Sequence, residues 1–192
     1  MTNLKVEIAQ ERPFSSVAEE ALLNLMRTAD CLHRAMQRKT RGWGVTSTQY
    51  NVLRILRGAQ PQGLTCSAIG TRMITAEPDI TRLLARLKTL KLIRQQRDKR
   101  DRRVLWTHIS PAGLALLEEM DPVIVQFPKE TLGQLDDTRL RTLIELLELA
   151  RKNCQDSQAQ VSCTGSVSCD GKGPDSAVVD KCHGTGDETV SG

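Results

Sequence analysis

The sequence has few aromatic residues and no long apolar run. Only 3% of its 192 residues are Phe, Trp or Tyr, so a hydrophobic core has to be built from aliphatic side chains, as in packed helices. Nowhere do about 18 apolar residues follow one another, and we therefore expect no membrane-spanning helix. The first residues, Met1 to Lys5, are not followed by an apolar stretch, so we expect no signal peptide and a cytoplasmic protein.

Cysteine is also sparse, with six residues in the chain. Without a secretion signal we interpret all six as reduced thiols. Cys31 and Cys66 fall in helical patterns, where a small core residue is a more ordinary role than a sensor. Four potential zinc ligands lie near the C-terminal end: Cys163, Cys169, Cys182 and His183. Zinc sites usually contain more closely spaced cysteine pairs, so we predict no metal and no cofactor, and a metal- or thiol-responsive sensor stays an alternative.

Motifs of enzymes are missing as well. The sequence has no nucleophile elbow, no phosphate-binding loop, no H-E-x-x-H motif and no pair of carboxylates in a defined setting. We therefore predict that the protein is not an enzyme.

Positive charge is present, but it is concentrated in one part of the chain. The net charge is +4 overall. Residues 72–103 contain 11 Lys and Arg against four Asp and Glu, a net charge of +7, whereas residues 155–192 have a net charge of −4. A concentrated excess of positive charge is typical of a surface that binds a polyanion such as a nucleic acid.

Apolar residues recur every three or four positions in six segments, and this spacing predicts helices. The helices are expected to begin near residues 15, 46, 66, 76, 111 and 137. Thr75 is expected to be the N-cap of the fourth helix, with Pro78 in its first turn. Pro122 and Pro128 are expected to kink or break the fifth helix.

Between the fourth and fifth helices the apolar period changes from about 3.6 to two. Residues 94–97 and 104–109 flank a charged stretch, which predicts a β-hairpin with a charged tip. The fold class is therefore mainly α with a small β-hairpin wing, a winged helix-turn-helix. We divide the chain as follows: an N-terminal arm 1–14; a regulator domain 15–153, with dimerisation helices 15–41 and 110–153 and a DNA-binding lobe 46–109; and a tail 154–192, which lacks apolar periodicity and is expected to be disordered.

Three segments carry a resemblance to the MarR family of bacterial regulators. DITRLLARL (79–87) resembles the family's recognition helix, DKRDRR (98–103) fits the wing pattern D-x-R-D-x-R, and ISPAG (109–113) is similar to the L-T-x-x-G that opens the next helix. The resemblance spans roughly residues 15–153. It implies a homodimer that binds double-stranded DNA at a pseudo-palindromic operator and acts as a repressor.

The sequence departs from the family at two positions. The family commonly has Gly between the recognition helix and the wing, where a left-handed turn is needed, and this chain has Lys91. The peroxide-sensing members keep a reactive cysteine early in the first helix, where this chain has Leu22. Because Cys31 lies more than two turns further on, we expect no such redox mechanism.

Residues expected to contact DNA lie on the helix-turn-helix and the wing: Ser67, Thr75, Thr81, Arg82, Arg86, Lys88, Arg97, Lys99, Arg100, Arg102 and Arg103. Arginine can donate two hydrogen bonds to guanine in the major groove, and a wing arginine can enter a narrow minor groove. Asp98 and Asp101 are expected to brace the wing by pairing with Arg100 or Arg103. Glu77 and Asp79 would repel phosphates unless they accept from cytosine N4, cap the helix N-terminus or pair with arginines, and we favour capping.

Two other readings of the basic segment remain. Charged helix faces are usually only solvated, and the wing charges could form a surface cluster of little energetic value. A winged helix can also be a protein-interaction module, but such a module would more often expose apolar residues where this chain has arginines.

The resemblance further implies a small aromatic or phenolic effector in the cleft between the dimerisation and DNA-binding parts. His33 and Tyr50 are the candidate lining residues, although a histidine at the boundary of a core is commonly structural. An effector bound there would change the spacing of the two DNA-reading lobes and release the operator.

Overall fold

The computed structural model describes residues 3–164, and the side chains of residues 3–154. The chain forms two compact units, residues 1–136 and 137–192, which are described separately. No helix in the part of the chain that is described has both the length and the apolar character needed to cross a membrane.

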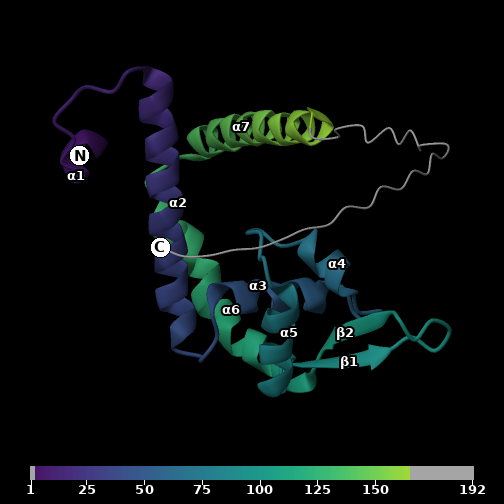
Figure 1. Ribbon diagram of the computed structural model, residues 1–192. Helices are drawn as coiled ribbons and strands as arrows, with labels where there is room; N and C mark the ends of the chain where they lie inside the picture. The colour runs from purple at the N-terminus through teal and green to yellow at the C-terminus, as the bar shows by residue number, and fades with distance from the viewer. Residues whose placement is uncertain (1–2, 165–192) are drawn as a thin grey trace, which may run out of the picture. The chain divides into compact units, whose positions relative to one another are not determined.

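The first unit is mainly helical with one small hairpin, as predicted (Figure 1). Its elements are α1 (Leu4–Glu7), α2 (Val17–Arg41), α3 (Ser47–Gly58), α4 (Cys66–Gly70), α5 (Ile80–Thr89), β1 (Ile93–Arg97), β2 (Leu105–Ile109) and α6 (Pro111–Leu132). The arm predicted for residues 1–14 thus contains a single helical turn.

Polar N-caps set where these helices begin. The capping side chains of α2 to α6 are Ser16, Thr46, Thr65, Asp79 and Ser110. Each accepts a hydrogen bond of 2.8–3.3 Å from the main-chain N–H three residues further on, which satisfies a donor that has no partner inside the helix.

The start of α5 differs from the prediction that Thr75 caps it. Asp79 is the N-cap, and its carboxylate accepts a hydrogen bond of 2.8 Å from the Arg82 amide. Pro78 precedes this cap instead of lying in the first turn. Thr and Asp are both good capping residues, and the sequence pattern alone did not separate two candidates four positions apart.

A kink or a break is predicted at Pro122 and Pro128, and the break is wrong, because α6 runs through both prolines. Proline inside a helix removes a main-chain hydrogen bond and costs about 3 kcal/mol. The buried side chains of Leu117, Met120 and Ile124 flank this region, and their burial stabilises the continuous helix.

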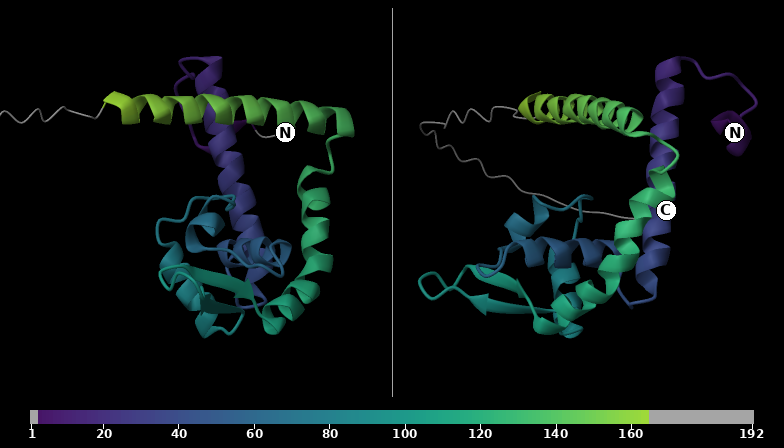
Figure 2. Two further views of the ribbon diagram at one scale, coloured as in Figure 1. Left: turned by 90° about the vertical axis from the view of Figure 1, so that its right-hand side faces the viewer. Right: turned by 180° about the vertical axis from the view of Figure 1, so that it is seen from behind.

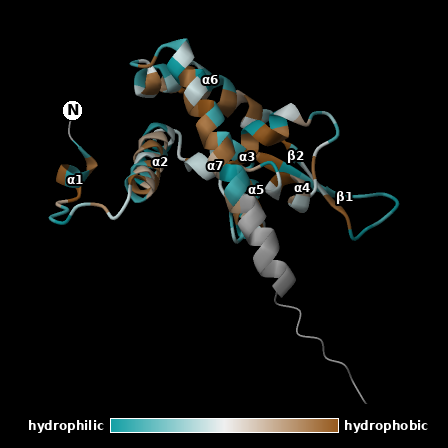
Figure 3. Ribbon diagram, turned by 90° about the horizontal axis from the view of Figure 1, so that it is seen from above, coloured by the Kyte–Doolittle hydropathy of each residue, from teal (hydrophilic) through white to brown (hydrophobic). Residues whose placement is uncertain are grey.

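The hydrophobic core surrounds α3. This helix contacts α2, α4, α6 and β2, and its Val52, Leu53 and Leu56 are at most 1% exposed. Helices α2 and α6 also contact each other and run beside this region (Figure 2), and Figure 3 shows hydrophobic residues concentrated on α3 and α6. The core is aliphatic, as the shortage of aromatic residues predicts.

The hairpin pairs β1 and β2 in antiparallel register, from Ile93 opposite Ile109 to Arg97 opposite Leu105. Leu64 extends the sheet, since it exchanges two main-chain hydrogen bonds of 2.8–2.9 Å with Thr107. The apolar end of the hairpin is buried, whereas its charged tip projects away from the helices (Figures 1 and 2). This geometry confirms the predicted wing.

The turn between α5 and β1 keeps its left-handed shape although it lacks glycine. Lys91 has φ of +60°. The Lys91 amide donates to the Lys88 carbonyl, and the Leu92 amide donates to the Leu87 carbonyl, which together form a Schellman motif with lysine at the position that usually holds glycine.

The second unit contains α7 (Asp137–Thr164), which starts where the sequence predicts. Leu140, Leu143 and Leu147 are half-buried along one face. The helix includes residues 154–164, which were assigned to the tail from the sequence. The rest of the predicted tail, residues 165–192, lies outside the described residues.

Candidate nucleic-acid interface

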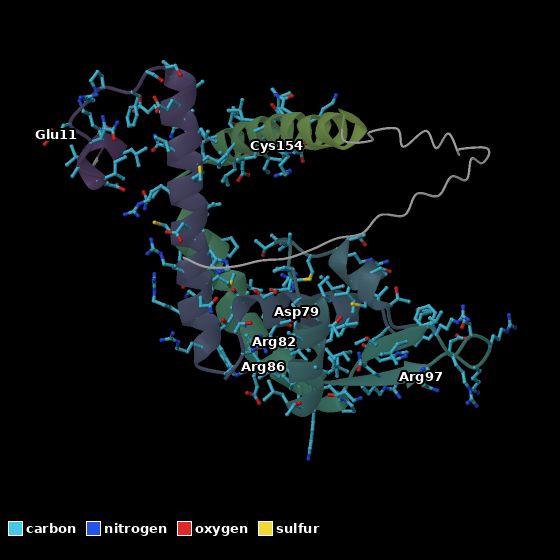
Figure 4. The ribbon with its side chains drawn as sticks, in the orientation of Figure 1. Glu11, Asp79, Arg82, Arg86, Arg97 and Cys154 are labelled. Carbon is cyan, nitrogen blue, oxygen red and sulfur yellow. The ribbon has the colours of Figure 1, made fainter. Side chains whose placement is uncertain are left out.

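Helix α5 separates buried apolar residues from exposed polar ones. Leu84 and Leu87 are at most 2% exposed, whereas Thr81, Arg82, Arg86 and Lys88 are all exposed. Figure 4 shows Arg82 and Arg86 on this helix. The side chains predicted to contact DNA therefore lie together on the solvent side of one helix.

Asp79, at the start of α5, is a helix cap as interpreted from the sequence. Its carboxylate is turned to the helix N-terminus, where the Arg82 amide donates to it, and a negative charge is favourable there. An acidic residue on this surface is thereby explained without a role in DNA recognition.

The two other helix-turn-helix candidates lie apart from α5. Ser67 is exposed in the first turn of α4, and its hydroxyl is 3.3 Å from that of Thr65. Thr75 is exposed in the loop that leads to α5. The Asn51 side chain of α3 accepts a hydrogen bond of 3.2 Å from the Ile74 amide in this loop.

The wing loop is organised by Asp98. One of its carboxylate oxygens accepts hydrogen bonds from the amides of Arg100 and Asp101 at 2.7 and 3.0 Å. The other accepts from the indole N–H of Trp106 at 2.9 Å. The Asp98 amide donates to the Val104 carbonyl at 2.9 Å, which closes the loop.

The brace differs in one respect from the prediction of carboxylate–guanidinium pairs. Asp98 accepts from main-chain amides, and Asp101 likewise accepts from the Arg103 amide at 2.9 Å. The aspartates therefore hold the loop while the guanidinium groups of Arg100 and Arg103 stay outside these bonds. Arg97 instead donates to the Arg102 carbonyl at 2.8 Å.

The arginines of α5 and of the wing take no part in the ion pairs recorded among the described side chains. Those pairs involve other residues: Arg27–Glu7, Arg34–Asp30, Lys39–Glu130 and Arg57–Asp121. Hydrogen bonds from the Asp101 amide, the Trp106 indole and the Arg100 amide lower the pKa of Asp98. The wing thus combines a charged, fixed carboxylate with exposed arginines at its tip.

A separate cavity of about 390 Å³ brings together the two candidate effector residues. His33 from α2 and Tyr50 from α3 both line it, together with Ile74 and Thr75 from the loop before α5. Burial raises the pKa of Tyr50, although the positive charge of Arg54 acts in the opposite direction.

Arg54 also lines this cavity, and sequence reasoning missed it. Its guanidinium carbon lies 5.9 Å from the centre of the Tyr50 ring, close enough for a cation–π contact. The available signal was its spacing, because Tyr50 and Arg54 are four residues apart on one helix and so face the same side.

Trp106 is the other residue that sequence reasoning missed. Its position on β2, opposite Gln96 in the register, gives no sign that its indole reaches the carboxylate that organises the wing. The available signal was its amphipathic character, since a partly buried tryptophan usually finds an acceptor for its N–H.

Cys31 and Cys66 were both expected to be core residues, and the structure places only one of them there. Cys66 is half-buried against the core, whereas Cys31 is exposed, so its assignment to the core is wrong. Within the described residues no group of three or more His, Cys, Asp or Glu is placed to hold a metal ion. Cys169, Cys182 and His183 lie outside the described residues, as does the side chain of Cys163.

Comparison with known proteins agrees with this arrangement. A family model described as the MarR family matches residues 43–104, which contain the helix-turn-helix and the wing. The chain is 26% identical over 118 residues to a transcriptional regulatory protein for the hcr operon of Thauera aromatica, and the match covers 62% of this chain and 70% of that protein.

Two solved structures are also similar. Bordetella bronchiseptica BpsR, in a structure that concerns regulation of its DNA binding by 6-hydroxynicotinic acid, is 25% identical with a TM-score of 0.62, covering 69% of this chain and 99% of that chain. A MarR transcription factor from Planctomyces limnophilus is 36% identical with a TM-score of 0.56, covering 71% of this chain and 99% of that chain. On the strength of that identity and coverage, the chain belongs to the MarR family of transcription regulators.

Proposed function

We propose that the protein binds a pseudo-palindromic DNA operator as a homodimer, represses transcription there, and is released by a small effector. The observation that carries this proposal is the pairing of two basic elements, the exposed face of α5 and the braced wing. Both display arginines that take no part in the ion pairs recorded among the described side chains.

The two elements suit different grooves of the duplex. A helix fits the major groove, where Arg82 and Arg86 can donate paired hydrogen bonds to guanine and Thr81 can contact a phosphate or a thymine methyl. The narrow hairpin tip suits the minor groove, whose negative potential attracts Arg100 or Arg102. Lys88, Lys99 and Arg103 would contribute contacts to phosphates.

A homodimer is supported by apolar side chains that are exposed in the described part of the chain. On α2, Leu22 and Met26 are 56% and 61% exposed, and on α7, Ile144 and Leu149 are 54% and 61% exposed. Exposed apolar surface of this kind typically marks an interface. A twofold dimer would place two copies of α5 about one DNA turn apart.

The cavity beside Tyr50 is the proposed effector site. Its lining combines apolar walls from Leu32, Met36 and Phe127 with the guanidinium of Arg54, a combination that suits an aromatic ring bearing a negative or polar group. BpsR, whose DNA binding is regulated by 6-hydroxynicotinic acid, supports this class of effector. The loop of Ile74 and Thr75 leads directly into α5, so a bound molecule would touch the chain that places the recognition helix.

A protein-binding module is less well supported. The solvent side of α5 carries Thr81, Arg82, Arg86 and Lys88, and a protein-binding face would more often display an exposed apolar patch. A metal sensor would have to use the C-terminal cysteines, because no group of three or more His, Cys, Asp or Glu among the described residues is placed to hold a metal ion. Mass spectrometry of the native protein for bound zinc separates that alternative from the proposal.

Selection of duplexes from a random pool by the purified protein tests the proposal. We expect a pseudo-palindromic site, a dimer by light scattering, and a loss of about three to five decades of affinity between roughly 50 and 200 mM salt, the effect of six to ten phosphate contacts. A flat salt response, or a monomer at micromolar concentration, would overturn it.

A further inference from the structure

Trp106 connects the body of the hairpin to the wing loop. It lies in β2, is half-buried, and donates its indole N–H to Asp98 at 2.9 Å. Asp98 follows the last residue of β1. The hydrogen bond therefore joins the two strands at the point where the loop begins.

The Asp98 carboxylate connects Trp106 to the main chain of the wing loop. With one oxygen held by Trp106, the other is oriented toward the amides of Arg100 and Asp101, at 2.7 and 3.0 Å. A carboxylate bound through both oxygens cannot rotate without breaking a hydrogen bond, and hydrogen bonds to a charged acceptor are stronger than neutral ones. We call this set of three hydrogen bonds the Trp106–Asp98 bracket.

We propose that Trp106 is a positioning residue for DNA binding, which orients Asp98 and thereby fixes the wing loop in the conformation that presents Arg100 and Arg102. The inference rests on the proposed function, because it assigns the bracket a role in binding the minor groove. A loop that is ordered before it enters a groove loses less conformational entropy on binding than a mobile one.

The bracket is suited to order the loop without supporting the core. Arg100 and Arg102 are exposed, as are the intervening loop residues, and the buried core lies at the other end of the hairpin, around Ile93 and Ile109. Loss of the bracket should therefore weaken DNA binding while the free protein loses little thermal stability.

The test compares Trp106→Phe, Asp98→Asn and the double variant. Phe keeps a ring and removes the N–H donor. Asn at position 98 can still accept from the amides, but it would turn an NH₂ group toward the indole donor. Each single variant should bind a duplex with A·T-rich flanks about five- to tenfold more weakly, the equivalent of one charged hydrogen bond partly screened by water. The double variant should be no weaker than the worse single variant, since both remove one interaction.

Asp101→Asn is the matched control. It removes the same charge from the same loop, yet the amide oxygen can still accept from Arg103, and Asp101 does not contact Trp106 in the recorded hydrogen bonds of the described residues. It should bind DNA as tightly as the wild type or more tightly, because one negative charge near the phosphates is gone. Preference for the base pairs under α5 should be unchanged in all these variants.

Failure of the inference is distinguishable from failure of the proposed function. If the wild type binds duplex DNA and Trp106→Phe binds it equally well, or if the effects of Trp106→Phe and Asp98→Asn add fully, Trp106 is not a positioning residue. If the wild type binds no DNA, the proposed function fails. Amide hydrogen exchange of Arg100 and Asp101 then still tests the bracket, and exchange that is no faster in Trp106→Phe would overturn it.

Discussion

Arg57 and Asp121 form a two-pronged ion pair that joins α3 to α6, with Nη1–Oδ2 at 2.6 Å and Nη2–Oδ1 at 3.3 Å. The hydrogen bond to Asp121 is the largest of the effects that raise the pKa of Arg57. Both side chains are about one-third exposed, so water weakens the attraction between the two charges but does not remove it. The pair links the helix at the centre of the core to the helix that follows the wing.

Breaking this pair should lower the stability of the first unit. We expect Asp121→Asn to reduce the free energy of unfolding by about 1 kcal/mol, because an ion pair with two hydrogen bonds contributes more to stability than the median surface ion pair does. Urea denaturation measures the change. Asp30→Asn is the control, because its pair with Arg34 is more exposed and lies within one helix, and its loss should cost less than about 0.5 kcal/mol. Equal effects of the two variants would contradict the prediction.

The recognition helix and the wing should respond differently to loss of an arginine. Arg82→Ala or Arg86→Ala should weaken operator binding by about 1–3 kcal/mol and relax the preference at particular base pairs. Arg102→Ala should weaken binding to all sequences more evenly, with the largest loss at A·T-rich flanks. Binding to the selected operator and its single-base variants measures both effects. If Arg102→Ala altered base preference while both helix variants bound normally, the assignment of α5 as the recognition helix would be wrong.

Gly113 should tolerate no side chain. A Cβ at this position would collide with the Leu92 carbonyl oxygen and lie 2.8 Å from Cγ1 of Ile109. Gly113→Ala should therefore destabilise the protein by about 1–3 kcal/mol, the usual effect of overpacking. Gly58→Ala is the matched control, because a Cβ there meets nothing within 4 Å, and alanine favours helix by up to about 1 kcal/mol. Thermal unfolding of both variants should show shifts of opposite sign.

Lys91→Gly should stabilise the protein. Lys91 has φ of +60°, a conformation that costs a residue other than glycine about 1 kcal/mol or more. We expect the free energy of unfolding to rise by about 0.5–1 kcal/mol. The same substitution three residues earlier, Lys88→Gly, falls inside α5 and should lower it by about 1 kcal/mol. Destabilisation by both substitutions would show that the Lys91 side chain makes compensating contacts.

The wing should keep its hydrogen bonds to lower pH than an ordinary aspartate would allow. Because the pKa of Asp98 is lowered, its stabilising contribution is present above the ordinary Asp pKa and is lost as the pH falls through the lowered value. The chain contains two tryptophans, so an NMR spectrum should show two indole N–H resonances, and Trp106→Phe identifies one of them. The Trp106 resonance should shift only at a pH below the usual Asp pKa. A shift that begins at about pH 5 would contradict a lowered pKa for Asp98.

The sequence predicted those parts of the fold that depend on local patterns. Ser110 is a recognisable cap beside periodic apolar residues, Ser15 and Ser16 are two candidates for the cap of α2, and the change of period around the charged wing identifies the hairpin. Tertiary contacts decide the remainder. Pro122 lies inside an unbroken helix because neighbouring side chains are buried, and Cys31 is exposed because no described side chain packs over that face of α2.

The sequence predicted which residues lie on the candidate interface, but it did not predict which side chains contact one another there. Arg82 and Arg86 are four residues apart, so helical periodicity alone places them on one side of α5. The bond between Trp106 and Asp98 depends on hairpin register and on the loop conformation. Similarly, Arg54 could be placed beside Tyr50 by helical spacing, whereas the cavity they line requires α2, the loop before α5 and α6 to converge on α3.

The positions of the two tryptophans give the protein two intrinsic optical probes. Trp43 packs against the hydrophobic core at the end of α2, and Trp106 lies in the wing. With Trp106→Phe the remaining emission follows unfolding of the core, and with Trp43→Phe it follows the environment of the wing. Engagement of the wing by a duplex and unfolding of the core can therefore be recorded separately, in a chain that carries no attached dye.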